Sequence, residues 1–147
     1  MSRPLDAIMT DNLVRFLALE SMDEQQFKRR TKDVALRVIR LVESLPKSRT
    51  ADVLARQLLR AATSVGANYR AACRGKSAAD MIAKLAIVEE EADETLYWLD
   101  LIAEVRLVRK TRLQKLIAEI DELVAMIVAS QKTLRRNNPK SKIQNPK

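Results

Sequence analysis

The stretch TADVLARQLLRAATSVGANYRAACRG, residues 50–75, decides the fold class of this chain. Its apolar side chains recur every three or four residues, a spacing that places them on one face of a helix, at Leu54, Leu58, Ala61, Ala62, Val65, Tyr69 and Ala72. Thr50 can cap the first turn of that helix. Gly75 suits the left-handed position after the last turn, where Arg70 and Arg74 lie near the negative helix end. The stretch therefore predicts a helix with one buried face.

Three further segments on either side show the same periodicity. Each begins with a capping box, a Ser or Thr followed three residues later by an acidic or amide side chain, at Ser21–Glu24, Ser77–Asp80 and Thr111–Gln114. Pro46 ends the first of these helices, and the second extends to about Val108. We expect the first to bury Phe27, Val34, Ala35, Val38, Leu41, Val42 and Leu45, and the last to bury Leu113, Leu116, Ile117, Ile120, Leu123, Val124, Ile127 and Leu134.

Four helices joined by short connections predict an all-α, antiparallel, up-down-up-down four-helix bundle over residues 22–134. No alternating strand pattern competes with this prediction. Residues 1–21 are predicted as an N-terminal extension that can hold a short amphipathic helix. Residues 135–147, RRNNPKSKIQNPK, are predicted as a disordered basic tail.

The composition is that of one soluble domain. The chain has 147 residues and a net charge of +8, but six of its basic residues lie from Lys132 onward, where no acidic residue occurs. Removing those six leaves 21 basic against 19 acidic residues, so the predicted bundle is close to neutral. Cys73 is alone and cannot form an internal disulfide. No signal peptide pattern and no apolar run of about 20 residues occurs, so we expect a cytoplasmic protein without a membrane span.

The segment LAIVEEEADETLYWLDL, residues 85–101, places five carboxylates within six positions of a helix that must also bury a face. At 100° per residue the core face is predicted as Ile82, Leu85, Glu89, Ala92, Leu96, Leu99 and Ala103. Tyr97 lies on roughly the opposite face. That second face also carries the residues predicted to form an oligomer interface, which are Ile87, Glu90, Glu94, Trp98, Leu101 and Val105. A helix that is apolar on two sides predicts a second buried contact, most simply with another copy of the chain.

Arginines line the outer face of the preceding helix at Arg56, Arg60, Arg70 and Arg74. In an antiparallel hairpin, Arg60 is about level with Glu91, and Arg56 is about level with Glu94 or Thr95. Three interpretations stay open for these arginines. They form a solvated face with modest ion pairs, or Arg56 and Arg60 pair across a subunit interface, or they form a basic strip for phosphates.

Glu89 is predicted as a buried carboxylate, which needs a hydrogen-bonding partner or a raised pKa. Arg37 or a buried Asn68 could supply the partner. A structural buried pair is favoured over a catalytic acid, because no second activating group accompanies Glu89.

The motifs of several enzyme classes are missing. A di-iron bundle needs histidine ligands, and the chain has no histidine. The carboxylates Glu89, Glu90 and Asp93 could hold Mg²⁺, but no glycine-rich phosphate loop accompanies them. Cys73 and Ser64 have no histidine base. The sequence therefore predicts no enzyme, and it indicates no catalytic residue, cofactor, metal or small-molecule substrate.

The stretch RQLLRAATSVGANYRAACRGKSAADMIAKLAIVEEEADETLYWL resembles the bacterial 23S rRNA intervening-sequence protein family, also called S23. The similarity extends from about Glu24 to Leu134, and the matching positions are Arg60, Ser64, Ala67, Asn68, Ser77 and Glu94. The chain departs from the family pattern at Ala71 and Ala72, where Glu-Gly is common, and at Gly75, where Arg is frequent.

The resemblance implies a left-handed bundle that assembles into homopentameric rings, and it implies no settled activity. Some members are encoded within intervening sequences of ribosomal RNA genes, and related accessory proteins of retroelements bind RNA and a reverse transcriptase. We therefore expect a self-associating, non-enzymatic scaffold, with a homopentamer as its assembly. The alternative is an RNA-binding accessory protein whose candidate nucleic-acid contacts are Arg70, Arg74, Lys76, Arg135 and Arg136.

Overall fold

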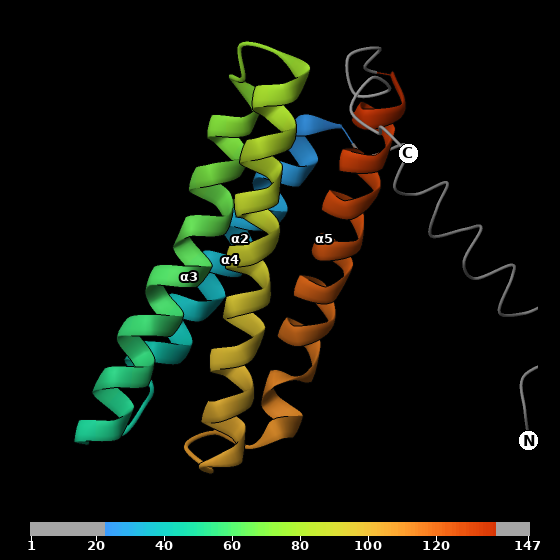
Figure 1. Cartoon of the computed structure of the whole chain (residues 1–147). Coiled ribbons are helices and arrows are strands. Elements are labelled where there is room, and N and C mark those ends of the chain that lie inside the picture. Colours follow the sequence, from blue (N-terminus) through green and yellow to red (C-terminus); the bar gives the residue numbers. More distant parts are fainter. Residues whose placement is uncertain (1–22, 138–147) are drawn as a thin grey trace, which may run out of the picture.

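The computed structural model describes residues 23–137, and four helices occupy most of that range (Figure 1). They are α2 (Glu24–Glu43), α3 (Arg49–Cys73), α4 (Ala78–Glu104) and α5 (Lys110–Asn137). Successive helices are antiparallel, so the predicted up-down-up-down bundle is confirmed. The predicted extension, residues 1–21, and most of the predicted tail lie outside the described residues. Residues 135–137, which we assigned to the tail, are the last turn of α5.

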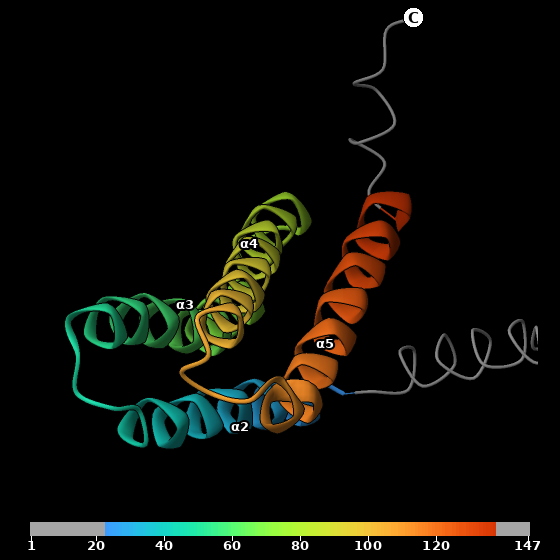
Figure 2. The same ribbon diagram turned by 90° about the horizontal axis from the view of Figure 1, so that it is seen from below.

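The helices follow one another around the bundle in the order α2, α3, α4, α5 (Figure 2). The contact between α3 and α4 is the most extensive, and the contact between α2 and α5 is the smallest of the four between neighbours. In this order α2 and α4 lie diagonally across the bundle, so their outer faces point away from each other. None of the helices within residues 23–137 is long and apolar enough to cross a membrane.

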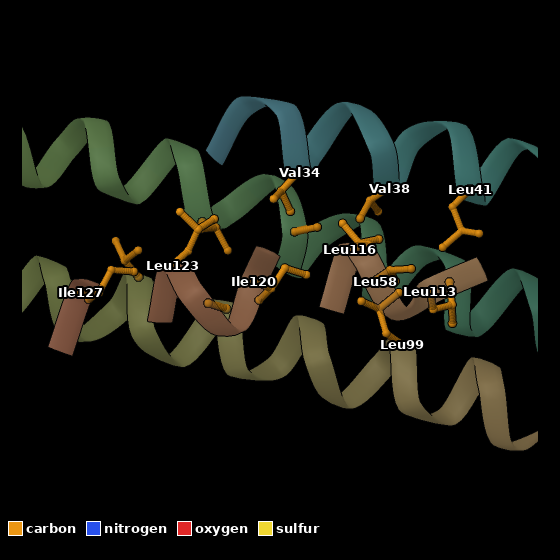
Figure 3. Close-up of a cluster of buried hydrophobic side chains, with 14 of the residues drawn as sticks. Val34, Val38, Leu41, Leu58, Leu99, Leu113, Leu116, Ile120, Leu123 and Ile127 are labelled. Carbon is orange, nitrogen blue, oxygen red and sulfur yellow. The ribbon is translucent and has the colours of Figure 1, made fainter. Parts of the chain in front are cut away.

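The core is a column of aliphatic side chains contributed by all four helices (Figure 3). Val38, Leu58 and Leu99 are completely buried, and Leu113 and Ile120 are nearly so. Burying one such side chain contributes about 1.5–3 kcal/mol to folding, so this column is the main source of stability. The periodic apolar positions of the sequence therefore account for the fold directly.

The buried face of α4 is rotated from the predicted one by less than one residue, since Leu85, Ala92 and Leu99 are buried as predicted. Val88, Thr95 and Ile102 are completely buried, whereas the predicted core residues Ile82, Leu96 and Ala103 are only partly buried. The rotation turns α4 toward α3, the helix with which it makes its most extensive contact. The Thr95 hydroxyl donates to the Glu91 carbonyl oxygen at 2.7 Å, which satisfies its hydrogen bond inside the core.

Side-chain caps fix where α2, α3 and α4 begin, but three of the four predicted caps are wrong. Thr111, which we predicted to cap the last helix, lies inside α5, which begins at Lys110. Asp23 caps α2 and accepts from the Gln26 amide at 2.7 Å, in place of Ser21, which lies outside the described residues. Ser48 caps α3 in place of Thr50, and it accepts from the Ala51 amide at 3.1 Å. Asp23 lies two residues after the predicted cap and Ser48 lies two residues before it, because any short polar side chain in extended backbone can satisfy the free amides.

The cap of α4 is confirmed. The Ser77 hydroxyl accepts from the Asp80 amide at 3.1 Å, and the Asp80 carboxylate accepts from the Lys76 amide at 3.0 Å. Gly75, just before this cap, does not adopt the left-handed backbone that we predicted. Its role is a close approach instead, because an added Cβ would lie 3.0 Å from the Ala72 carbonyl oxygen and 3.2 Å from the Met81 nitrogen. Within residues 23–137, Arg106 is the non-glycine residue with positive φ, at 58°.

Candidate assembly surface

The outer face of α4 carries an unusual amount of exposed apolar surface. We define the α4 outer face by the predicted interface residues of this helix and of its C-cap, Val105, together with Tyr97: Ile87, Glu90, Glu94, Tyr97, Trp98, Leu101 and Val105. Ile87, Tyr97 and Val105 are 42%, 55% and 50% exposed, respectively. Trp98 and Leu101 are partly buried and pack against the core, so they form the floor of this face. The Tyr97 and Trp98 rings meet edge to face with centroids 5.0 Å apart.

An ion-pair network connects this face to α3. The Arg60 guanidinium pairs with the Glu94 carboxylate, and its Nη1 lies 3.5 Å from Glu91 Oε2. Trp98 Nε1 donates to Glu94 Oε1 at 3.1 Å. The hydrogen bond from Arg60, and secondarily that from Trp98, holds the pKa of Glu94 below its ordinary value. The same contact with Glu94 raises the pKa of Arg60.

This network shows which groups one of the predicted arginines, Arg60, contacts within its own chain. Arg60 lies at the level of Glu91, as predicted, and it forms its ion pairs within its own chain. Arg56, which we expected level with Glu94, donates from Nε to the Asp52 carbonyl oxygen of its own helix at 3.3 Å. Glu94 is therefore partnered by Arg60 instead of Arg56. The network orients Trp98 and Glu94 on the outer face and leaves Glu90 exposed beside them.

Glu89 has a different partner from either of those predicted. It is partly buried, and its Oε2 accepts from Gln131 Nε2 at 2.8 Å. Arg37 instead pairs with Asp33 at 3.8 Å, and Asn68, also only partly buried, donates to the Ser64 carbonyl oxygen at 2.8 Å. The rotation of α4 moves Glu89 out of the core centre and toward α5, which explains the error.

Gln131 was missed in the sequence, although a signal was present. It continues the apolar stripe of the last helix after Ile120 and Ile127, where a buried amide is unexpected. Gln131 is only 4% exposed, and its Oε1 accepts from Arg135 Nη2 at 3.3 Å. Glu89, Gln131 and Arg135 thus form a polar chain between α4 and α5. A polar residue inside an apolar stripe predicts a partner on a neighbouring helix.

The predicted nucleic-acid contacts gather at one end of the bundle. Arg70, Arg74 and Lys76 are exposed where α3 ends and α4 begins. Arg135 and Arg136 are exposed in the last turn of α5, and the antiparallel order brings that turn to the same end (Figure 1). The sequence placed these five side chains in two separate segments, and the topology makes them one basic end.

Few groups on the described part of the chain have properties suited to catalysis or metal binding. No group of three His, Cys, Asp or Glu side chains within residues 23–137 could hold a metal ion. Burial raises the pKa of the Cys73 thiol, which disfavours its thiolate form. Burial also raises the pKa of the neighbouring Tyr69.

Comparison with models of known protein families identifies the family of the chain. Residues 23–129 match the model of the 23S rRNA-intervening sequence protein family. The chain belongs to this family. The match covers all of α2, α3 and α4 and most of α5, so the resemblance noted in the sequence is confirmed over nearly the whole bundle.

One of the solved structures that resemble this chain belongs to the same family. It is a protein of unknown function from the S23 ribosomal protein family of Bacteroides thetaiotaomicron, with 31% sequence identity and a TM-score of 0.70. The similarity covers 76% of this chain and 99% of the other. A search of curated proteins finds no match. The family relationship therefore establishes the fold of the chain and its relatives. Evidence on function comes from the surface of the bundle.

Proposed function

We propose that this protein is a non-enzymatic assembly module that associates with copies of itself, as the homopentameric ring that the family resemblance implies. The observation that carries the proposal is the α4 outer face. Ile87, Tyr97 and Val105 expose about half of their surfaces there, between carboxylates and above the partly buried Trp98 and Leu101. Exposed apolar side chains that gather on one face of a helix in a small domain are typical of a protein contact.

The energetics favour a repeated contact over a single one. Burying apolar surface contributes roughly 25 cal/mol per Å², so covering the exposed half of an Ile or Tyr side chain contributes about 1 kcal/mol. Three such side chains contribute about 3 kcal/mol, which is less than association commonly costs in lost freedom. In a closed ring each copy makes two contacts, and the last one forms without a further loss of freedom. A ring can therefore be stable where a dimer through this face is weak.

Sedimentation velocity on the full chain over a range of concentrations tests the proposal. We expect a particle heavier than one chain, and we expect Tyr97→Asp to reduce it to one chain while circular dichroism stays helical. The matched control is Ala125→Asp, which adds the same charge to an exposed position of α5 and should leave the assembly intact. A wild-type chain that sediments as a single copy at every concentration would refute the proposal.

Tyr97 is a better probe than Trp98. Trp98→Ala should also reduce the assembly, but Trp98 packs against the core and donates a hydrogen bond to Glu94. Its removal is therefore expected to lower the stability of the bundle as well. Tyr97 is the most exposed large apolar side chain of the α4 outer face, so its substitution acts on the surface alone.

A second candidate function, RNA binding, is favoured by the basic end. Arg70, Arg74 and Lys76 are exposed there and form no ion pair within residues 23–137. RNA binding predicts an affinity that falls steeply with salt and that weakens when residues 135–147 are deleted. Arg70→Glu with Arg74→Glu should abolish it, whereas Arg49→Glu, on the same helix at the opposite end of the bundle, should weaken it far less. Salt-independent binding, or equal effects of these variants, would argue against this function.

A further inference from the structure

A second exposed apolar face lies on α2. We define the α2 outer face as Arg29, Lys32, Leu36, Ile39 and Arg40. Leu36 and Ile39 are each 40% exposed, and the three basic side chains beside them are exposed as well. None of these three cations forms an ion pair within the part of the chain that the structure describes. Two exposed carboxylates, Asp33 and Glu43, flank the face, and Asp33 pairs with Arg37 at 3.8 Å, so the balance of the face is positive.

The α4 outer face has the opposite charge. Glu90 lies on it, and Asp93 and Glu104 flank it; all three are exposed. These carboxylates also lack an ion pair within residues 23–137. Residues 23–137 therefore present two apolar faces, one with three cations and one with three carboxylates that form no ion pair within this range. Opposite charges around two apolar surfaces favour contact between them and disfavour contact of either with itself.

The two faces point in opposite directions, because α2 and α4 lie diagonally across the bundle (Figure 2). A two-fold dimer would bring like faces together, α4 against α4 or α2 against α2, and would leave the other face exposed. A contact between the α2 face of one copy and the α4 face of the next covers both faces and can be repeated.

The faces also lie at the same height along the bundle. Gly66 of α3 lies against Thr31 of α2, where an added Cβ would be 3.3 Å from the threonine Oγ1. Since the helices are antiparallel, the residue six positions after Thr31 on α2, Arg37, is level with the residue six positions before Gly66 on α3, Arg60. Arg60 in turn pairs with Glu91 and Glu94. Leu36 and Ile39 are therefore level with the middle of the α4 outer face. In a closed ring, one copy is not displaced along the ring axis relative to the next. Two faces at the same height meet this condition when the bundles stand parallel to that axis.

We infer that the α2 outer face docks on the α4 outer face of a second copy of this chain, so that the assembly is heterologous. This inference rests on the proposed function, since it specifies how the copies meet. Leu36 and Ile39 insert among Ile87, Tyr97 and Leu101, while the cations of α2 meet the carboxylates of α4.

Two blocked variants test this pairing. In the first, Lys32→Glu with Ile39→Glu blocks the α2 outer face; in the second, Ile87→Glu with Tyr97→Glu blocks the α4 outer face, so that the two blocked faces repel each other. All four positions are exposed, so each chain should keep its helical circular dichroism. We expect each variant alone to sediment as one copy. Mixed in equal amounts at the highest concentration, the two should form a particle of two copies and no larger, because only one unblocked pair of faces is available. This contact covers Leu36 and Ile39 as well as the α4 side chains, so it is stronger than the α4 face alone would make it.

The control is Asp121→Lys with Lys132→Glu, the same kind of charge reversal on exposed positions of α5, which should leave the wild-type assembly unchanged. If either blocked variant keeps the wild-type mass, or if the mixture stays at one copy, the α2–α4 pairing is wrong while self-association stands. If the wild-type chain is itself a single copy, the proposed function fails, and this inference fails with it.

Discussion

Arg30 is predicted to hold α2 against α5 where these two helices have their smallest contact. Its Nε lies 2.7 Å from Glu119 Oε1, its Nη2 donates to Glu119 Oε2 at 2.9 Å, and the same Nη2 lies 3.2 Å from Glu122 Oε1. The Arg30 and Glu119 side chains are only 24% and 23% exposed. The hydrogen bond from Arg30 to Glu119 raises the pKa of the guanidinium. The geometry is the parallel two-bond arrangement that arginine forms with carboxylates.

The expected magnitude lies between two limits. Removing one partner of a fully buried pair costs about 3–5 kcal/mol, and an exposed pair contributes about 0–1 kcal/mol. For a pair that is three-quarters buried and doubly hydrogen-bonded, we expect Arg30→Met to lower the free energy of unfolding by about 2 kcal/mol. Methionine keeps an apolar stem beside Met126, whose Sδ lies 3.5 Å from Arg30 Nη1, so the loss reports mainly on the charges.

Urea denaturation of a double-mutant cycle, Arg30→Met with Glu119→Gln, measures the coupling between the two side chains. We expect about 1.5–2 kcal/mol. The control cycle is Arg37→Met with Asp33→Asn on the exposed side of α2, where the groups are 3.8 Å apart and one turn away from each other. That pair should couple by only about 0.3 kcal/mol. Equal coupling energies in the two cycles would refute the view that the Arg30–Glu119 pair joins the helices.

Three further predictions concern stability. Leu58→Ala removes a completely buried side chain and should lower the free energy of unfolding by about 2–5 kcal/mol in urea titrations. Gly75→Ala should destabilise the bundle by about 1–3 kcal/mol because the new methyl group meets backbone atoms, whereas Gly66→Ala meets the Thr31 side chain at 3.3 Å and should be nearly neutral. The pKa of Glu94 is lowered on folding, so its stabilising effect is full above the ordinary carboxyl pKa and is lost as the pH falls through the lowered value. The stability difference between wild type and Glu94→Gln should therefore shrink in acid, and a constant difference would contradict the role of Arg60.

The helices and their order could be predicted from the sequence because they depend on local periodicity. The apolar rhythm around Leu58 and Leu113 identifies one buried face for each helix, and four such faces have few ways to cover one another. The helix starts were less certain. At α3 both Ser48 and Thr50 are competent caps, and the choice between them depends on where the preceding chain turns. Ser77 had no such competitor and was predicted correctly.

The candidate assembly surface was predicted only in part. The two-sided character of α4 follows from its sequence, but the α2 outer face was missed. Leu36 and Ile39 fall outside the predicted buried face of that helix, and their spacing on its far side was the available signal. The opposition of the two faces could not be inferred from either helix alone, because it depends on α2 and α4 being diagonal neighbours.

By itself, the sequence determined the secondary structure, the bundle and the presence of a surplus apolar face, since each follows from residues a few positions apart. Only the tertiary structure decided which side chains meet across helices. The extensive contact of α4 with α3 buries Val88 and places Glu89 where it accepts a hydrogen bond from Gln131. It also pairs Glu94 with Arg60 instead of Arg56. A rotation of less than one residue is enough to change such partners. Its angle is set by the packing of all four helices together, which no single segment contains.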